Sequence, residues 1–303
     1  MTVRLEDTNA AAVSAAIASE RRRMGGGATG LVLTLVIPCE EADASDALTA
    51  AATAAREHPC RILCVISRPG RSEHRLDAEV SVGGDDGPGE TVTMRLRGHL
   101  AKQPANVVLP LLVSDTPIVT WWPGVAPAVP ANDPLGQLAQ RRITDSAAEP
   151  RPLKALLERQ ESYQPGDTDL AWTRCTPWRS LLAAVLDRPT DPITSAEVHA
   201  ARTNPSGPLL AGWLRDRLDV PVTLNPSRGP GVTGIRLDTR GGEISLTRND
   251  GRTGWLLRPG EPRREVPLRR RDLADLVAEE LRRLDADPVY GASLAATVLD
   301  LAP

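Results

Sequence analysis

The sequence predicts the α/β fold class: an N-terminal α/β layer domain with a mixed sheet, then a smaller α+β domain with an antiparallel meander and C-terminal helices. Three observations predict it. A strand, a helix and a second strand follow one another within residues 31–66. Short alternating strands fill residues 220–257, and the chain of 303 residues is long enough for two domains. We expect these domains to span residues 1–165 and 166–303.

The N-terminal domain begins with a helix followed by a strand–helix–strand pattern. Apolar residues at helical spacing predict a helix over residues 8–24. An apolar run at 31–37, rich in branched side chains and closed by Pro38, predicts a buried strand. An Ala-rich helix over 43–56 and a second buried strand over 61–66 follow. This spacing defines a βαβ unit, whose strands we expect to pair in parallel, as in Rossmann-like domains.

The rest of this domain changes to a period of two residues and then to short elements. Strands at 76–82 and 91–98 flank a glycine-rich loop and predict a hairpin. Residues 104–112 predict an apolar helix that is kinked or broken at Pro110. Three further elements complete the domain, namely a short strand at 118–121, a short helix at 133–141 and a strand at 143–144.

The C-terminal domain follows a connector at residues 146–169, which is rich in Pro, Glu, Arg and Gln and contains a short helical stretch at 153–159. Thr176 and Pro177 then predict the N-cap and first turn of a helix with Trp178 on its apolar face. The remaining predicted elements are, in chain order, a strand at 193–200, a helix at 209–218, the strands of the meander at 220–224, 234–237, 243–248 and 254–257, and helices at 273–284 and 288–301.

Composition and charge argue against several classes of protein. The formal net charge is −3 and the pI is about 5.9, without the basic footprint of a nucleic-acid-binding protein. Seven Arg and seven acidic residues interleave over residues 263–287, which is typical of a solvated face. No apolar run approaches the ~20 residues that span a bilayer. Glu6 and Asp7 precede the first Ala-rich stretch, opposite to a secretory signal. We expect a cytoplasmic protein that binds neither nucleic acid nor membrane.

The sequence shows no residues arranged for catalysis, cofactor binding or metal binding. The four His lie in different predicted elements, and the four Cys form no C-x-x-C. The glycine-rich segments at 25–30 and 83–89 do not lie between a strand and a helix, as a phosphate-binding loop must. Cys60 and Cys64 share a strand but lie ~13 Å apart, too far for a disulfide. We expect Cys60 to be a buried, inert thiol, with a redox role as the alternative.

The uncommon feature is a group of Trp, Arg and Asp side chains near the predicted domain junction. Trp121 and Trp122 are adjacent at a strand end and point to opposite faces, so we do not expect both in one core. Trp172 and Arg174 lie in a polar loop, and both residue types are enriched at binding hot spots. Three interpretations remain open: a seam between domains, a partner surface or a small-ligand pocket. The candidate residues are Trp121, Trp122, Arg141, Arg142, Asp145, Asp169, Trp172, Arg174 and Arg179.

Six segments of the chain are distinctive, namely HPCR at 58–61, VVLPLL at 107–112, TWW at 120–122, DPL at 133–135, RRITD at 141–145 and the run from 165 to 179. On these segments the chain resembles the bacterial glucose-6-phosphate dehydrogenase assembly protein family, OpcA. The resemblance covers most of the chain, from the first helix to the last, and its long central motifs are specific.

The resemblance implies a non-enzymatic assembly factor and allosteric activator of glucose-6-phosphate dehydrogenase, which supports NADPH production in the oxidative pentose phosphate pathway. It implies no catalytic residues and no cofactor. Some members of the family are linked to redox control by thioredoxin, for which this sequence shows no evident cysteine pair. We expect exposed members of the Trp, Arg and Asp group to contact the dehydrogenase.

Two other functions remain as alternatives. The N-terminal α/β domain could belong to an enzyme that binds a sugar phosphate or a nucleotide; such a ligand would then be turned over, or would stabilise the chain, without the dehydrogenase. The chain could also be an interaction module for another partner, which co-purification would identify. The sequence does not predict the oligomeric state.

Overall fold

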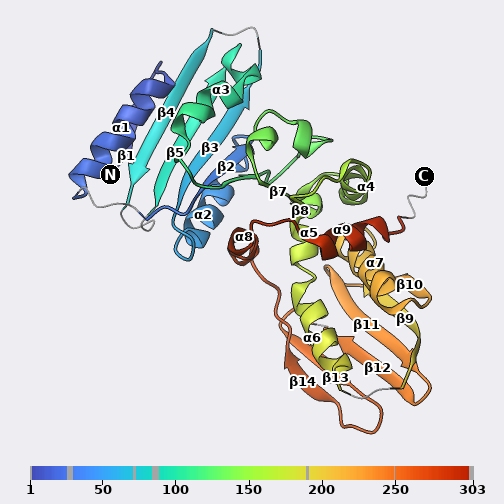
Figure 1. Ribbon diagram of the computed structural model, residues 1–303. Coiled ribbons are helices and arrows are strands. Elements are labelled where there is room, and N and C mark those ends of the chain that lie inside the picture. The colour runs from blue at the N-terminus through green and yellow to red at the C-terminus, as the bar shows by residue number, and fades with distance from the viewer. Residues whose placement is uncertain are drawn as a thin grey trace. The chain divides into compact units, whose positions relative to one another are not determined.

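The computed structural model describes residues 2–25, 30–70, 73–83, 89–188, 191–248 and 250–299 (Figure 1). It divides into two compact units, the first made of Met1–Asp145 and Leu273–Ala286, and the second of Ser146–Asp272 and Asp287–Pro303. Parts of the two glycine-rich segments, residues 26–29 and 84–88, lie outside the described residues. Among the residues that are described, no helix is long and apolar enough to cross a membrane.

The first unit is built on a mixed sheet, as predicted. Its strands are β1 (Thr2–Leu5), β2 (Leu33–Cys39), β3 (Cys60–Arg68), β4 (Arg75–Val82), β5 (Glu90–Arg97), β6 (Ile118–Trp121) and β7 (Arg141–Thr144), which lie in the order β1-β4-β5-β3-β2-β6-β7. β2 pairs in parallel with β3 and β6, and β3 with β5. β4 is antiparallel to β1 and β5. The predicted βαβ unit and hairpin are therefore confirmed.

Helices of the first unit pack on both faces of this sheet. They are α1 (Ala10–Arg23), α2 (Ala44–Ala54), α3 (Pro104–Val108) and α8 (Leu273–Arg282). Successive side chains of a strand point to opposite faces. Accordingly, Leu63 of β3 packs in one core with Val13 of α1, whereas Cys64 packs with Ala44 of α2 in another. The segment containing α8 is distant in sequence but packs against α2.

The short helix predicted at 133–141 is wrong. The Asp133 carboxylate accepts hydrogen bonds from the amides of Leu135 and Gly136 at 2.9 and 3.2 Å, which favours a turn over a continuing helix. Only a 3₁₀ turn forms, at Gly136–Leu138, and β7 begins at Arg141. By contrast, the predicted break at Pro110 is confirmed, because α3 ends at Val108 and a 3₁₀ turn follows at Leu109–Leu111.

The second unit contains a mostly antiparallel sheet. Its strands are β9 (Ile193–Ala200), β10 (Val222–Pro226), β11 (Val232–Thr239), β12 (Gly242–Thr247), β13 (Thr253–Leu257) and β14 (Arg264–Pro267), in the order β10-β9-β11-β12-β13-β14. The predicted meander is correct from β11 to β13 but wrong for β10, which pairs in parallel with β9. A crossover helix between β9 and β10 makes this pairing possible. β14 was not predicted.

Helices of the second unit pack with this sheet in a single hydrophobic core. The elements are α4 (Pro152–Ser162), the short strand β8 (Asp167–Asp169), α5 (Leu170–Thr173), α6 (Thr176–Leu186), α7 (Ser206–Leu218) and α9 (Pro288–Ala295). Trp178, Leu182 and Val185 form the buried face of α6, as the sequence predicts. The final helix was predicted to reach residue 301 but ends at Ala295.

The compact units divide the chain differently from the predicted domains. Residues 146–165 belong to the second unit, because Leu156 of α4 is part of its core. Residues 273–286 belong to the first unit, because α8 packs against α2. The polar segment 146–165, predicted to belong to the first domain, is therefore part of the second unit. The segment 273–286, which contains α8 and was predicted to belong to the second domain, is part of the first unit.

Gly212 lets α7 and α9 approach closely, and we expect Gly212→Ala to destabilise the second unit by about 2 kcal/mol. An added Cβ would collide with the Ser293 carbonyl and lie 2.7 Å from Oγ1 of Thr297. Urea unfolding followed by tryptophan fluorescence measures the change. Arg217→Ala, on the exposed side of the same helix, should change the free energy of unfolding by less than about 0.5 kcal/mol. A stabilisation of about 1 kcal/mol, the helix propensity of alanine over glycine, would contradict this close packing.

Candidate functional site

The structure buries most of the candidate site residues. Trp121, Trp122, Arg141, Arg142, Asp145, Asp169 and Trp172 are all less than 9% exposed. Arg174 and Arg179 are half-buried. Both adjacent tryptophans are buried, Trp121 being 0% and Trp122 4% exposed, and the expectation that they do not share one core stays a prediction. The seven buried side chains therefore offer little surface to a partner protein.

Arg141 fixes α8 to the sheet of the first unit. Its Nε donates a hydrogen bond to Oε2 of Glu280 at 3.2 Å, and its Nη1 donates to the Asp285 carbonyl at 2.7 Å. Both charged side chains are almost fully buried. A buried ion pair is destabilising to break, because removing one partner leaves the other charge in a poorly solvated place. Arg141 is therefore a structural residue of the first unit.

Trp121 and Trp122 mark the point where β6 ends beside β7. The amide of Trp122 donates to the carbonyl of Ile143 at 3.0 Å, which continues the contact between the two strands. Arg142, on β7, donates from Nη1 to the Ala139 carbonyl at 3.0 Å and thereby holds the loop that precedes it. The TWW and RRITD segments therefore stabilise the pairing of the short strands β6 and β7 and the loop between them.

Asp169 and Trp172 organise the start of α5 in the second unit. The Asp169 carboxylate accepts hydrogen bonds from the amide of Ala171 at 2.8 Å and from the hydroxyl of Ser146 at 2.6 Å. The indole Nε1 of Trp172 donates to Asp287 at 2.9 Å, and the same carboxylate caps α9. Arg179 stacks on the Trp172 ring with its guanidinium carbon 3.6 Å from the ring centroid. Trp172 therefore lies on a short buried helix, and the predicted polar loop is wrong here.

Sequence reasoning missed a pocket in the second unit that we call the arginine pocket. It has a volume of about 200 Å³ and is bordered by Pro177 and Trp178 of α6, Ser206 of α7, and Val232 of β11. Arg174 is the candidate site residue that lines it. The arginines around it are Arg174, Arg248, Arg269, Arg270 and Arg271, and none of the described residues that line it is acidic. Arg269, Arg270 and Arg271 are consecutive in the sequence, but only the fold brings this run beside Arg174 and Arg248.

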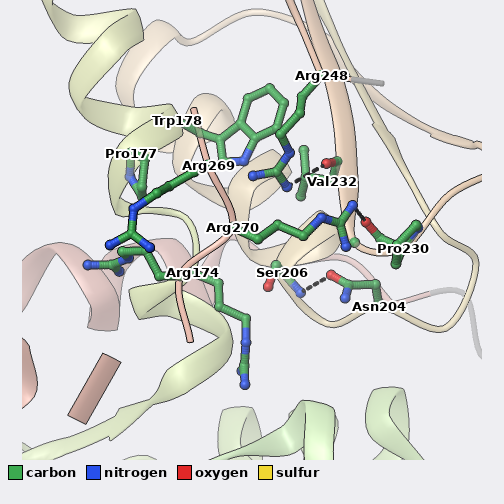
Figure 2. A pocket seen from close by; sticks show the side chains of 12 residues that line it. Arg174, Pro177, Trp178, Asn204, Ser206, Pro230, Val232, Arg248, Arg269 and Arg270 are labelled. Atoms are coloured by element: carbon green, nitrogen blue, oxygen red, sulfur yellow. Dashed lines mark hydrogen bonds between the residues drawn. The ribbon is translucent and has the colours of Figure 1, made fainter. Parts of the chain in front are cut away.

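Arg248 is the most deeply buried of these arginines. Its Nη1 and Nη2 each donate to a backbone carbonyl, those of Leu268 and Val232, at 3.1 Å. Its buried Nε has no hydrogen-bond partner among the described residues. Figure 2 shows Arg248 beside Trp178, with Arg270 directed toward Pro230, to whose carbonyl it donates. Burial, together with the charge of Arg270, lowers the pKa of Arg248 to about 10, so the group is still protonated at neutral pH.

A second hollow, which we call the crevice, lies at the carboxyl ends of β2 and β6 in the first unit. It has a volume of about 350 Å³ and is lined by residues that follow both strands, including Cys39, Glu40, Asp43 and Trp122. β3 pairs with one side of β2 and β6 with the other, so the strand order reverses there. In open α/β sheets, ligands commonly bind at such a switch point.

The residues of the crevice do not fit a dinucleotide. A dinucleotide-binding loop is glycine-rich and presents a helix N-terminus to the pyrophosphate. Here the chain between β2 and α2 reads Glu40, Glu41, Ala42 and Asp43, without a glycine. Glu41 is paired with Arg95 and Arg68, but the carboxylates of Glu40 and Asp43 line the crevice, and within the described part of the chain no cationic side chain does. These charges repel a pyrophosphate.

Two cysteines also lie together in the first unit, which sequence reasoning did not find. The Sγ atoms of Cys39 and Cys64 are 3.6 Å apart, because β2 and β3 are neighbours. The contact with the Cys64 thiol lowers the pKa of Cys39, whereas this contact and burial raise the pKa of Cys64. Cys60 is buried, as expected, and burial raises its pKa to about 12. The register of the predicted βαβ unit was the signal that could have indicated the pair.

The fold and these sites define an α/β protein with a Rossmann-like first unit and a basic pocket in an α+β second unit. Two family models match it in succession. The model described as glucose-6-phosphate dehydrogenase subunit N-terminal domain matches residues 51–161, and that described as the C-terminal domain of the same subunit matches residues 165–294. The chain belongs to this OpcA family. All six distinctive segments of the sequence lie within the matched residues.

Similar solved structures include oxidoreductases of low sequence identity. The 3-ketoreductase KijD10 from Actinomadura kijaniata, solved with NADP and TDP-benzene, is 10% identical with a TM-score of 0.48, over 87% of this chain and 94% of that one. An oxidoreductase from Sinorhizobium meliloti is 11% identical with a TM-score of 0.43, over 87% and 86% of the two chains. A dehydrogenase (MviM) from Clostridium difficile is 7% identical with a TM-score of 0.44, over 86% and 95%. The chain has no significant match among curated proteins.

Removal of the Arg141 guanidinium should loosen α8. We expect Arg141→Met to destabilise the packing of this helix by about 3 kcal/mol, because Glu280 stays buried without that counter-charge. Hydrogen exchange of the amides of Leu273–Arg282 should then accelerate about 100-fold. Arg282→Gln is the matched control, since Arg282 pairs with Glu57 on the exposed side of the helix and such pairs contribute about 0–1 kcal/mol. Equal acceleration in both variants would contradict the role of Arg141.

Cys39 should be the most reactive thiol of the native chain. Its lowered pKa and partial exposure increase its accessible thiolate, whereas burial raises the pKa of both Cys60 and Cys175 to about 12. We expect iodoacetamide at pH 8 to label Cys39 about tenfold or more faster than either buried thiol, measured by peptide mass spectrometry. Cys64→Ala should slow Cys39, and Cys60→Ala should not. Labelling of Cys175 as fast as Cys39 would overturn this order.

Proposed function

We propose that the chain assembles with glucose-6-phosphate dehydrogenase and activates it allosterically, without catalysing a reaction itself. The observation that carries the proposal is the pair of family matches over residues 51–161 and 165–294, both described as domains of a glucose-6-phosphate dehydrogenase subunit. In that role the chain supports NADPH production by the dehydrogenase at the entry to the oxidative pentose phosphate pathway.

The chemistry of the crevice supports a binding role over an enzymatic one. The alternative function, an enzyme for sugar phosphates or nucleotides on the first unit, needs a site that accepts phosphate. The switch point of the sheet instead carries the carboxylates of Glu40 and Asp43. Like charges at a phosphate site cost binding energy. The fold class alone does not assign a ligand, because function depends on the residues of the site.

Activation requires that the chain bind the active form of the dehydrogenase more tightly than the inactive form. A tenfold increase in substrate affinity corresponds to a coupling of ~1.4 kcal/mol, which a few interface contacts can supply. Among the candidate residues, Arg174 and Arg179 have exposed side-chain surface. Arg179 also stacks on Trp172, so Arg174 is the better residue to substitute.

The test mixes the purified full chain with purified glucose-6-phosphate dehydrogenase of the same organism. We expect a complex in size-exclusion chromatography with light scattering, and a KM for glucose 6-phosphate lowered about tenfold. Arg174→Ala should weaken the complex about tenfold or more without lowering the Tm of the chain. Arg240→Ala, at an exposed arginine of the same unit, is the control.

Each outcome bears on a separate part of the proposal. The absence of a complex would overturn it. A complex with unchanged kinetics of the dehydrogenase would overturn activation and leave assembly. Turnover of glucose 6-phosphate with NADP by the chain alone would support the enzymatic alternative. Undiminished binding by a folded Arg174→Ala variant would remove Arg174 from the contact surface.

A further inference from the structure

We propose that the arginine pocket of the second unit binds a small phosphomonoester, an activity beyond assembly with the dehydrogenase, although Arg174 borders this pocket as well. The pocket lies within the second unit, between the starts of two helices and the end of the sheet, and Figure 2 shows the arginine side chains that border it. The proposal rests chiefly on Arg248 and Arg270, whose hydrogen bonds among the described residues all go to backbone carbonyls.

The first argument is unbalanced positive charge in a buried place. Arg248 is 6% exposed, donates only to backbone carbonyls and keeps a buried Nε without a partner among the described residues. Arg270 donates to the Pro230 carbonyl and likewise has no carboxylate partner in the described part of the chain. Asp250 is the nearby acid, but it is exposed and its Oδ1 accepts from the amides of Arg252 and Thr253 at 2.8 Å. Buried charges are ordinarily paired, so an anion is the missing partner.

The second argument is the direction of the backbone dipoles. α6 and α7 both begin at the pocket, since Pro177 and Trp178 of α6 and Ser206 of α7 line it. The N-terminus of a helix carries a partial positive charge and favours an anion. Two helix starts, the buried guanidinium of Arg248 and the half-buried guanidinium of Arg270 therefore all favour an anion.

Charge and size select the class of ligand. Arginine matches the oxygens of phosphate with paired N–H donors, and a dianion compensates two neighbouring arginines better than a monoanion does. About 200 Å³ holds roughly seven water molecules at ~30 Å³ each, which suits a phosphate with a short carbon chain and no nucleotide base. Pro177, Trp178 and Val232 supply an apolar wall for the carbon part.

Titration of the full chain with inorganic phosphate and with glycerol phosphate tests the site, without any dehydrogenase present. Sodium chloride keeps the ionic strength constant, and glycerol is the uncharged control. We expect saturable calorimetric binding of both phosphates at one site, and a shift of the Arg248 Nε–H resonance in NMR spectra. Arg270→Gln and Arg248→Lys should each weaken binding about tenfold or more. Arg240→Gln, which removes the same charge from an exposed site of the second unit, should not.

The proposal is overturned if phosphate acts no more strongly than chloride at equal ionic strength, or if Arg270→Gln binds as tightly as the natural chain. Binding of a polyglutamate peptide without binding of phosphate would also overturn it, in favour of an acidic protein segment. Should Arg248→Lys fail to fold, the phosphate affinity of Arg270→Gln and the shift of the Arg248 Nε–H resonance in the natural chain still test the site. Because no dehydrogenase is used, a negative result here leaves the assembly function unaffected.

Discussion

The buried contact between Arg141 and Glu280 is the interaction on which the architecture of the chain depends. It joins β7 to α8 across 139 sequence positions, and the Asp285 carbonyl strengthens it. Because a buried guanidinium must be compensated, residues 273–286 return to the first unit. The second unit is therefore formed by a long interruption of the first, followed by the end of the chain. Two domains joined by one linker do not describe this connectivity.

The sequence was sufficient to predict a helix or strand and its packing partner where the two are close along the chain. The βαβ unit of β2 and β3 and the hairpin of β4 and β5 follow from hydrophobic period and turn residues. The helix expected at 133–141 fails because one carboxylate, Asp133, satisfies two amides and makes a turn. The prediction for β10 is wrong for another reason. The helix α7 connects β9 to β10 as a crossover, so that these two strands pair in parallel. Local secondary-structure propensity indicates neither the turn at Asp133 nor the crossover through α7.

The functional sites, too, depend on contacts between residues that are distant in sequence, here between charged and polar side chains. Trp172 is buried because Asp287, 115 positions later, accepts its indole hydrogen, which no local pattern shows. A formal net charge of −3 conceals an acidic crevice in one unit and an arginine pocket in the other. The balance of Arg and acids along residues 263–287 holds for the sequence, yet Arg270 borders the arginine pocket, where none of the described lining residues is acidic. Proximity in three dimensions decides which charges compensate each other.

The interrupted first unit also affects the order in which the protein folds during synthesis. A ribosome adds about 5–20 residues per second, so Glu280 is made roughly 7–30 s after Arg141. During this interval the outer side of α2 lacks α8, and Arg141 lacks its carboxylate. The first unit closes only after most of the second has been translated. A nascent chain that stalls before residue 273 therefore presents an unfinished surface to chaperones and proteases, although every strand of its first sheet is already complete.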